Sequence, residues 1–133
     1  MTVEQNKVVV DRFFTAVNER DFSVLDEVLT DDFSTPLDAP GLSRDALKSV
    51  LAYYVAAFPD LTYDIVAMIG EDDALAVHLN MHGTHKGDYQ GNAGTGKTFS
   101  VDEVEMMRFR DGKIAGFKII WDEAEFRRQL GFG

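Results

Sequence analysis

The chain has 133 residues, a length that suits one domain with a single core, and we expect one domain over residues 1–133. Its formal net charge of −10 argues against nucleic acid as a partner, because phosphate binding needs a basic surface. Cysteine is absent, which excludes disulfide scaffolds and cysteine nucleophiles. Neither a membrane-spanning apolar run nor a signal peptide is evident, so we expect a cytoplasmic protein without a membrane partner.

Apolar residues recur at helical spacing in the first half of the chain. The stripe from Val10 to Val17 predicts a helix of about four turns. A short second helix is expected to follow Asp21 as its cap. A third helix begins at Ser43, a favourable N-cap residue, and ends at Pro59.

The second half changes to the two-residue period of β-strands. Four segments alternate apolar and polar residues: 61–69, 77–81, about 98–110 and 113–121. Asp111-Gly112 is a hairpin signal between the last two of these segments. Helices followed by a meander of antiparallel strands predict an α+β fold, with the helices on one face of the sheet.

Residues 91–98, GNAGTGKT, match the phosphate-loop pattern G-x-x-x-x-G-K-[ST]. A working phosphate loop follows a buried strand and opens a helix, because the helix N-terminus binds the phosphates. Here polar residues precede the loop and β-rich residues follow it. We therefore expect a glycine-rich connection between strands, and we keep a nucleotide-hydrolysing enzyme only as a distant alternative.

Asp122 directly follows the apolar residues Ile119, Ile120 and Trp121. Burial beside Trp121 would raise the proton affinity of this carboxylate and suit it to general-base work. Asp122 also opens the sequence DEAE, a capping-box-like start for a last helix. An N-cap role favours the charged carboxylate, so the two roles make opposite demands, and the sequence leaves both open.

Several segments in order resemble the SnoaL-like polyketide cyclases, a branch of the NTF2-like superfamily: VVVDRFFTAVNERDFSVLDEVLTDDF, MRFRDGKI and WDEAEFRRQLG. The resemblance covers nearly the whole chain. It implies an NTF2-like cone in which N-terminal helices pack on a curved, mostly antiparallel sheet around an apolar pocket. It further implies aldol cyclisation without metal or cofactor, Asp122 as the acid/base, and a homo-oligomer, with a dimer as the expected state.

Glu105 is the second candidate catalytic residue. Ketosteroid isomerase shares the superfamily fold, resembles this chain through MRF, and keeps a protonated carboxylic acid at the position that matches Glu105. Such an acid donates a hydrogen bond to a developing oxyanion. A solvated strand residue is the alternative interpretation. The ligand-binding residues that we expect, with plain core packing as their alternative, are Phe13, Met81, His85, Met107, Phe117, Ile119 and Trp121.

His78, Asn80 and His82 fall on one face of a predicted strand and suggest a metal site. No third ligand is evident, and the resemblance turns these residues away from the pocket, so we expect no metal. His85 is expected either to anchor a loop or to lie near the pocket mouth.

The sequence thus predicts a SnoaL-like enzyme that performs cofactor-free acid/base chemistry on a small apolar carbonyl compound. Asp122 would remove a proton from carbon, and Glu105 would stabilise the enolate. The alternative is a non-catalytic, small-molecule-binding domain in which Asp122 only caps a helix.

Overall fold

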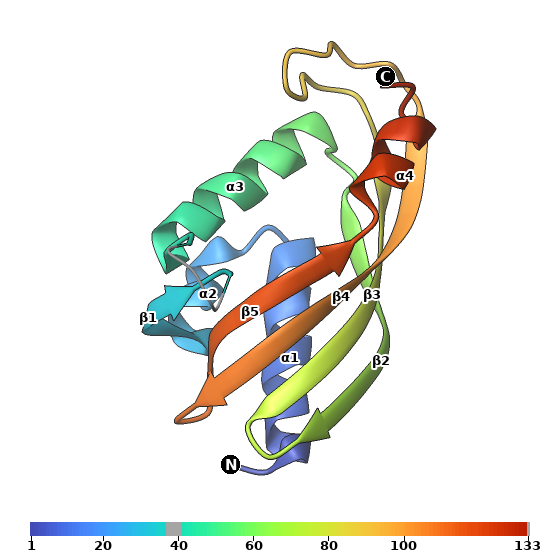
Figure 1. Ribbon diagram of the computed structural model, residues 1–133. Helices are drawn as coiled ribbons and strands as arrows, with labels where there is room; N and C mark the ends of the chain where they lie inside the picture. Colours follow the sequence, from blue (N-terminus) through green and yellow to red (C-terminus); the bar gives the residue numbers. More distant parts are fainter. Residues whose placement is uncertain (37–40, 133) are drawn as a thin grey trace.

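The computed structural model describes residues 1–36 and 41–132. Its helices are α1 (Val3–Asn18), a 3₁₀ turn η1 (Phe22–Val24), α2 (Leu25–Val28), α3 (Arg44–Ala57) and α4 (Glu123–Gln129). Its strands are β1 (Leu29–Ser34), β2 (Thr62–Glu71), β3 (Ala74–Thr84), β4 (Thr98–Arg110) and β5 (Lys113–Trp121) (Figure 1). The α+β class predicted from the sequence is confirmed.

The helix starts follow the capping residues. Thr2 and Gln5 form a capping box at the start of α1, and the Ser43 hydroxyl accepts a hydrogen bond from the Ala46 N–H at 3.2 Å. The predicted second helix is only partly present. Its segment forms η1 and a single turn of α2, and the Asp21 side chain makes no capping hydrogen bond.

The sheet has the strand order β1-β5-β4-β3-β2. Strands β2 to β5 form the predicted antiparallel meander, and Asp111 and Gly112 both have positive φ in the β4–β5 turn. Strand β1 pairs in parallel with β5, with Leu29 opposite Ile114. Helix α3 and the meander separate these two strands in the sequence, so this long-range pairing was not predictable from local patterns.

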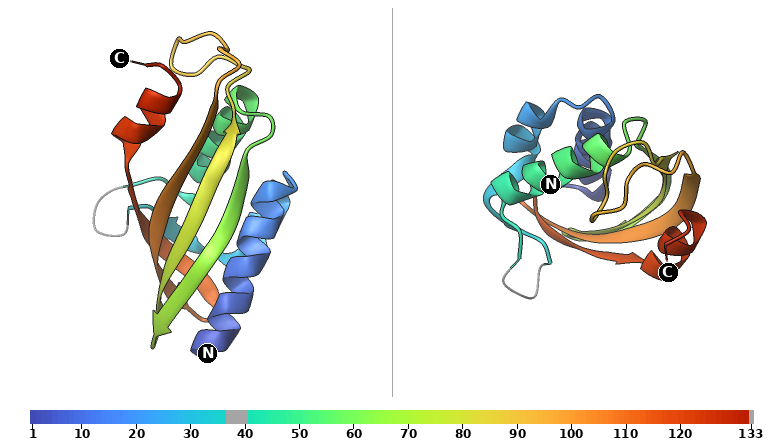
Figure 2. Two further views of the ribbon diagram at one scale, coloured as in Figure 1. Left: turned by 90° about the vertical axis from the view of Figure 1, so that its right-hand side faces the viewer. Right: turned by 90° about the horizontal axis from the view of Figure 1, so that it is seen from above.

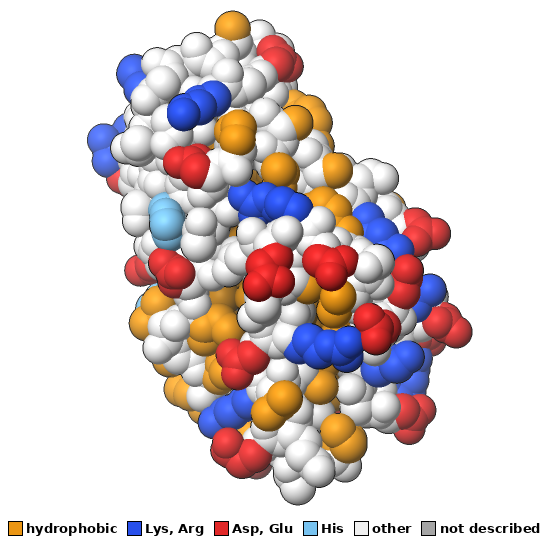
Figure 3. All heavy atoms as spheres, turned by 180° about the vertical axis from the view of Figure 1, so that it is seen from behind, with side chains coloured by type: hydrophobic (Ala, Val, Ile, Leu, Met, Phe, Trp, Pro, Cys, Tyr) orange, Lys and Arg blue, Asp and Glu red, His pale blue; other side chains and the backbone are white. Residues whose placement is uncertain are grey.

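Helices α1 and α3 lie against the concave face of the curved sheet, as Figure 2 shows. Their apolar stripes and the inward side chains of the strands form the main core, which includes Val10, Phe14, Leu51, Leu79 and Phe117. On the helix side the surface carries interspersed acidic and basic side chains with smaller apolar areas between them (Figure 3). Within the described residues, no helix has both the length and the apolar character that a membrane crossing requires.

A second core lies at the end of the sheet, where α4 packs. It contains Phe58, Tyr89, Phe99, Phe126 and Leu130, all almost fully buried. The ring centroids of Phe99 and Phe126 are 4.8 Å apart in an edge-to-face arrangement. This aromatic cluster fixes α4, and with it the end of β5, at that end of the sheet.

Candidate active site

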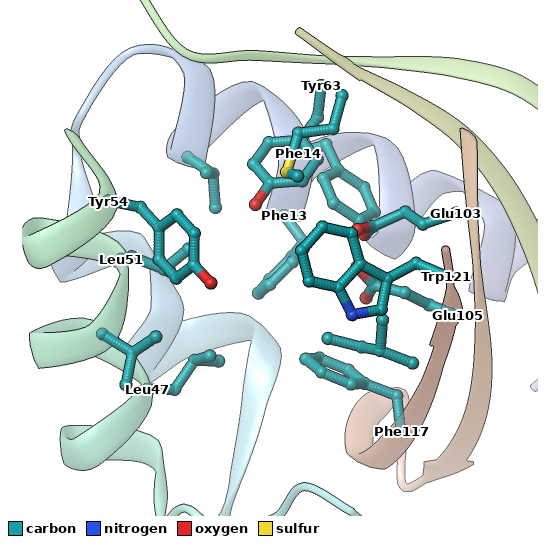
Figure 4. Close-up of a pocket in the computed structure, with 14 residues that line it drawn as sticks. Phe13, Phe14, Leu47, Leu51, Tyr54, Tyr63, Glu103, Glu105, Phe117 and Trp121 are labelled. Atoms are coloured by element: carbon teal, nitrogen blue, oxygen red, sulfur yellow. The ribbon is translucent and has the colours of Figure 1, made fainter. Parts of the chain in front are cut away.

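A cavity of about 180 Å³ lies between α1, α3 and the concave face of the sheet (Figure 4). Every element that surrounds it contributes side chains, and most of these are apolar or aromatic. They are Phe13, Phe14, Val17, Leu47, Val50, Leu51, Tyr54, Tyr63, Met81, Glu103, Glu105, Phe117, Ile119 and Trp121. A concave apolar space with a few polar groups is the usual form of a small-molecule site.

Two carboxyl groups lie in this apolar wall. Strand β4 alternates strictly, so that its inward positions are Val101, Glu103, Glu105, Met107 and Phe109. Glu103 is 5% exposed and Glu105 is 3% exposed. One oxygen of each carboxyl group, Oε1, is buried without a hydrogen-bond partner in the described structure. Buried carboxyl groups are rare without partners, so this pair is the strongest sign of a functional site.

Burial raises the pKa of Glu105 well above its ordinary value, and the hydrogen bond to Glu103 and the negative charge of Glu103 raise it further. Burial also raises the pKa of Glu103, although the hydrogen bond from Glu105 partly opposes this rise. Two adjacent carboxyl groups in an apolar site share a proton, because two adjacent negative charges are unfavourable there. Burial and its neighbour therefore favour the protonated form of Glu105 more strongly than that of Glu103.

The raised pKa of Glu105 predicts a pH-dependent stability. The folded state holds this proton more tightly than the unfolded state does, so the stabilisation is present at acidic pH and is lost as the pH rises through the folded-state pKa. Glutamine cannot ionise. Between pH 4.5 and pH 8, the free energy of unfolding of Glu105→Gln should therefore rise by about 1–3 kcal/mol relative to that of the wild type. This is the usual cost of a poorly satisfied buried polar group.

Urea unfolding of both proteins across this pH range measures the effect. Glu123→Gln, at an exposed position in α4, is the matched control and should leave the pH dependence of the wild type unchanged. A Glu105→Gln protein whose stability follows the wild type in parallel at every pH would contradict the raised pKa.

Three further polar groups border the cavity. The Tyr54 hydroxyl, on α3, lies 3.2 Å from the Tyr89 hydroxyl. Tyr63 is held by Asn18, whose side chain exchanges two hydrogen bonds of 2.9 Å with the Tyr63 backbone. Trp121 is the cross-strand neighbour of Glu103, and its indole ring faces the cavity beside the two glutamates (Figure 4). These groups place hydrogen-bonding atoms around an otherwise apolar space.

Asp122 lies outside this cavity wall. Its side chain is exposed and accepts a hydrogen bond of 3.0 Å from the Glu125 N–H at the start of α4. This contact is the N-cap arrangement that the sequence DEAE indicates. The structure does not bring Asp122 together with Glu105, and the catalytic role of Asp122 stays a prediction.

The capping contact predicts the effect of removing the Asp122 side chain. Asp122→Ala should lower the free energy of unfolding by about 0.5–2 kcal/mol, because the Glu125 N–H loses its acceptor. Asp122→Asn should cost much less, because asparagine caps helices nearly as well. Chemical unfolding of the two variants measures this difference, and equal losses would show that the negative charge of Asp122, rather than capping, stabilises the fold.

Five of the expected ligand-binding residues line the cavity: Phe13, Met81, Phe117, Ile119 and Trp121. Met107 is buried in the main core and does not reach the cavity wall. His85 is fully buried outside the cavity, where its Nδ1 atom contacts the Thr95 hydroxyl at 3.1 Å and its ring lies between Phe58 and Phe132. His85 therefore anchors the β3–β4 connection.

The glycine-rich segment 91–97 is part of that connection and leads directly into strand β4. Lys97 is exposed, and its backbone carbonyl accepts a hydrogen bond from the His85 N–H. No helix begins after the segment in residues 98–110, so the phosphate-loop geometry is absent from this part of the chain. His78 and His82 lie on the outer face of β3, as expected, and approach Asp102 and Asp64.

The candidate residue that sequence reasoning did not select is Glu103. It lies in the same two-residue phase as Glu105, Met107 and Phe109 on β4, so an inward position could have been read from that pattern. The sequence does not show that a cavity, rather than solvent, lies in front of this face.

A cone-shaped α+β domain with an acidic pair in an apolar pocket defines a class of small-molecule-binding proteins and enzymes. The chain belongs to the SnoaL-like polyketide cyclase family, whose model matches residues 7–130. The NTF2-like fold and the family expected from the sequence are thus confirmed. A comparison with curated proteins finds no match.

Solved structures with the same fold include TsrD from Streptomyces laurentii, at 22% identity and a TM-score of 0.89, covering 98% of both chains. IdmH from Streptomyces antibioticus has 28% identity and a TM-score of 0.83, covering 96% of this chain and 99% of its own. A SnoaL-like polyketide cyclase from Agrobacterium tumefaciens has 19% identity and a TM-score of 0.81, covering 95% and 98%.

Proposed function

We propose that this protein is an acid/base enzyme of the SnoaL-like type that acts on a small apolar carbonyl compound, with Glu103 and Glu105 as its catalytic pair. One observation carries the proposal: two neighbouring carboxyl groups lie buried in the wall of an apolar cavity, each with an unpartnered oxygen. In many active sites, two titratable groups have pKa values that their environments move apart, so that one acts as the acid and the other as the base.

The first step would be removal of a proton from the carbon beside a carbonyl group. The Glu103 carboxylate takes this proton as the C–H bond breaks, and the electron pair moves onto the carbonyl oxygen. Glu103 is then neutral and no longer requires the proton of Glu105. The Glu105 carboxylic acid can therefore turn its hydrogen bond to the enolate oxygen, which stabilises the developing charge.

A cyclisation would follow when the enolate carbon attacks a second carbonyl carbon in the same molecule. A carbon–carbon bond forms, and the resulting alkoxide recovers a proton from Glu103, which restores the starting state of the pair. Substrate and product are isomers, so the sequence of steps needs no oxidant, reductant or second substrate. The cavity favours a folded ligand conformation by surrounding it with apolar side chains.

The alternative is a non-catalytic binding domain, in which the glutamates only form hydrogen bonds with a ligand. The test is proton removal from 5-nitrobenzisoxazole, a two-ring carbon acid. Loss of its proton from carbon breaks the N–O bond and releases a coloured phenolate, so a desolvated carboxylate base is detected without knowledge of the natural substrate. An enzyme of the proposed type should accelerate this reaction, and a binding domain should not.

A further inference from the structure

Among the residues that the structure describes, those that line the cavity include acidic groups but no basic group. Of the fourteen described residues that line it, two are glutamates and none is a lysine, an arginine or a histidine. The pKa shifts of Glu103 and Glu105 come from burial and from the neighbouring carboxyl group, and not from a basic side chain. A negative charge on this pair therefore has no countercharge among the described residues of the cavity wall.

The same pair leaves hydrogen-bond acceptors unused. The Oε1 atoms of Glu103 and Glu105 are buried and have no partner in the described structure. A buried acceptor without a donor is costly, so a ligand that donates hydrogen bonds would be favoured at this position. A ligand with a carboxylate would instead bring further acceptors and a second negative charge beside the first.

Aromatic rings form much of the remaining wall. Six rings border the cavity, from Phe13, Phe14, Tyr54, Tyr63, Phe117 and Trp121, and Figure 4 shows Tyr54 facing the glutamates from the α3 side. The faces of aromatic rings attract cations as well as apolar groups. An aromatic wall with an adjacent acidic pair is complementary to a protonated amine that carries an apolar body.

We propose that the ligand of this cavity carries a protonated nitrogen on a body of one or two rings. The nitrogen donates hydrogen bonds to the free oxygens of Glu103 and Glu105, and the rings pack against the aromatic wall. The cavity of about 180 Å³ sets the size, since a cavity of roughly 150 Å³ holds benzene. This inference rests on the proposed function only in placing the ligand beside the same pair, and it narrows the proposed apolar carbonyl compound to one whose apolar body also carries an amino group.

Trp121 provides the measurement. It is the only tryptophan of the chain, so its indole N–H gives a single NMR signal at the cavity wall. Benzylamine, benzyl alcohol and benzoate, which share a ring and differ in charge, would be titrated at pH 8 and about 0.15 M salt, where exposed charges are screened beyond about 8 Å. Benzylamine should bind at least about tenfold more tightly than benzyl alcohol, and benzoate should bind most weakly.

The charge preference should depend on the glutamate pair. The double variant Glu103→Gln/Glu105→Gln should bind benzylamine no more tightly than benzyl alcohol, and the single variant Glu105→Gln should retain part of the preference. Glu123→Gln removes an exposed carboxylate near the same end of the sheet and should keep the wild-type preference. Equal binding of the three probes, no binding of benzylamine, or a preference that persists in the double variant would overturn the inference.

The two proposals fail in different ways. A protein that prefers benzylamine but does not open 5-nitrobenzisoxazole, an uncharged probe, would keep the amine site and lose the proposed catalytic function. A protein that opens the probe but binds the three ring compounds equally would keep the catalytic pair and lose the amine site.

Discussion

Replacing Glu103 by glutamine should lower the rate of 5-nitrobenzisoxazole opening by at least about 100-fold, the usual contribution of a positioned general base. The variant keeps the size of the side chain and its place on β4, but it removes the carboxylate that receives the proton. Burial makes this carboxylate a stronger base than an exposed one, because the surrounding apolar rings solvate the negative charge poorly. Release of the coloured phenolate measures the rate directly.

Matched variants distinguish whether the base is Glu103, Glu105 or Asp122. Glu105→Gln leaves the Glu103 carboxylate in place, and its amide can still donate a hydrogen bond to Glu103, so the loss of rate should be smaller than in Glu103→Gln. Asp122→Asn should retain the wild-type rate, because Asp122 is exposed and caps α4. If Asp122→Asn loses the activity and Glu103→Gln keeps it, the base is Asp122, as the sequence predicts.

Local patterns were sufficient for most of the fold. The stripe around Val10 and Phe14 predicts α1, Ser43 predicts the start of α3, and alternation predicts the strands of the meander, because each signal acts through neighbouring residues. The short helix expected after Asp21 is only partly present, as η1 and one turn of α2, for the opposite reason. The helix ends at Val28, because Leu29 already pairs with Ile114 of β5, more than eighty residues away, and sheet pairing overrides the local preference there.

The site was less predictable than the fold. Asp122 was predicted to be the base because it directly follows an apolar run. However, β5 ends at Trp121, and Asp122 lies outside the cavity wall, where it caps α4. Glu105 was selected through a resemblance and does lie in that wall. The two-residue alternation of β4 is enough to predict that Glu103 points inward. It does not predict that a cavity lies there, because the cavity is formed by α1 and α3 in front of the sheet.

Replacing Phe126 by alanine should lower the free energy of unfolding by about 3–5 kcal/mol, the range for a fully buried aromatic side chain. Phe126 is the buried residue of α4. Its ring lies 4.8 Å from that of Phe99, 5.2 Å from Trp121 and 5.8 Å from Phe58. Denaturant unfolding measures the loss, since the midpoint should fall while the cooperativity of the transition stays unchanged.

The same substitution should also disturb the cavity, because Trp121 packs on Phe126 and also lines the cavity. The indole N–H signal of Trp121 should therefore shift or broaden in Phe126→Ala under conditions where the protein remains folded. Phe126→Leu refills most of the space and should recover most of the stability and a sharp indole signal. If Phe126→Ala costs less than about 1 kcal/mol, too little for an aromatic ring removed from a tightly packed core, α4 is not held by this cluster, and the position of Trp121 must depend on β5 alone.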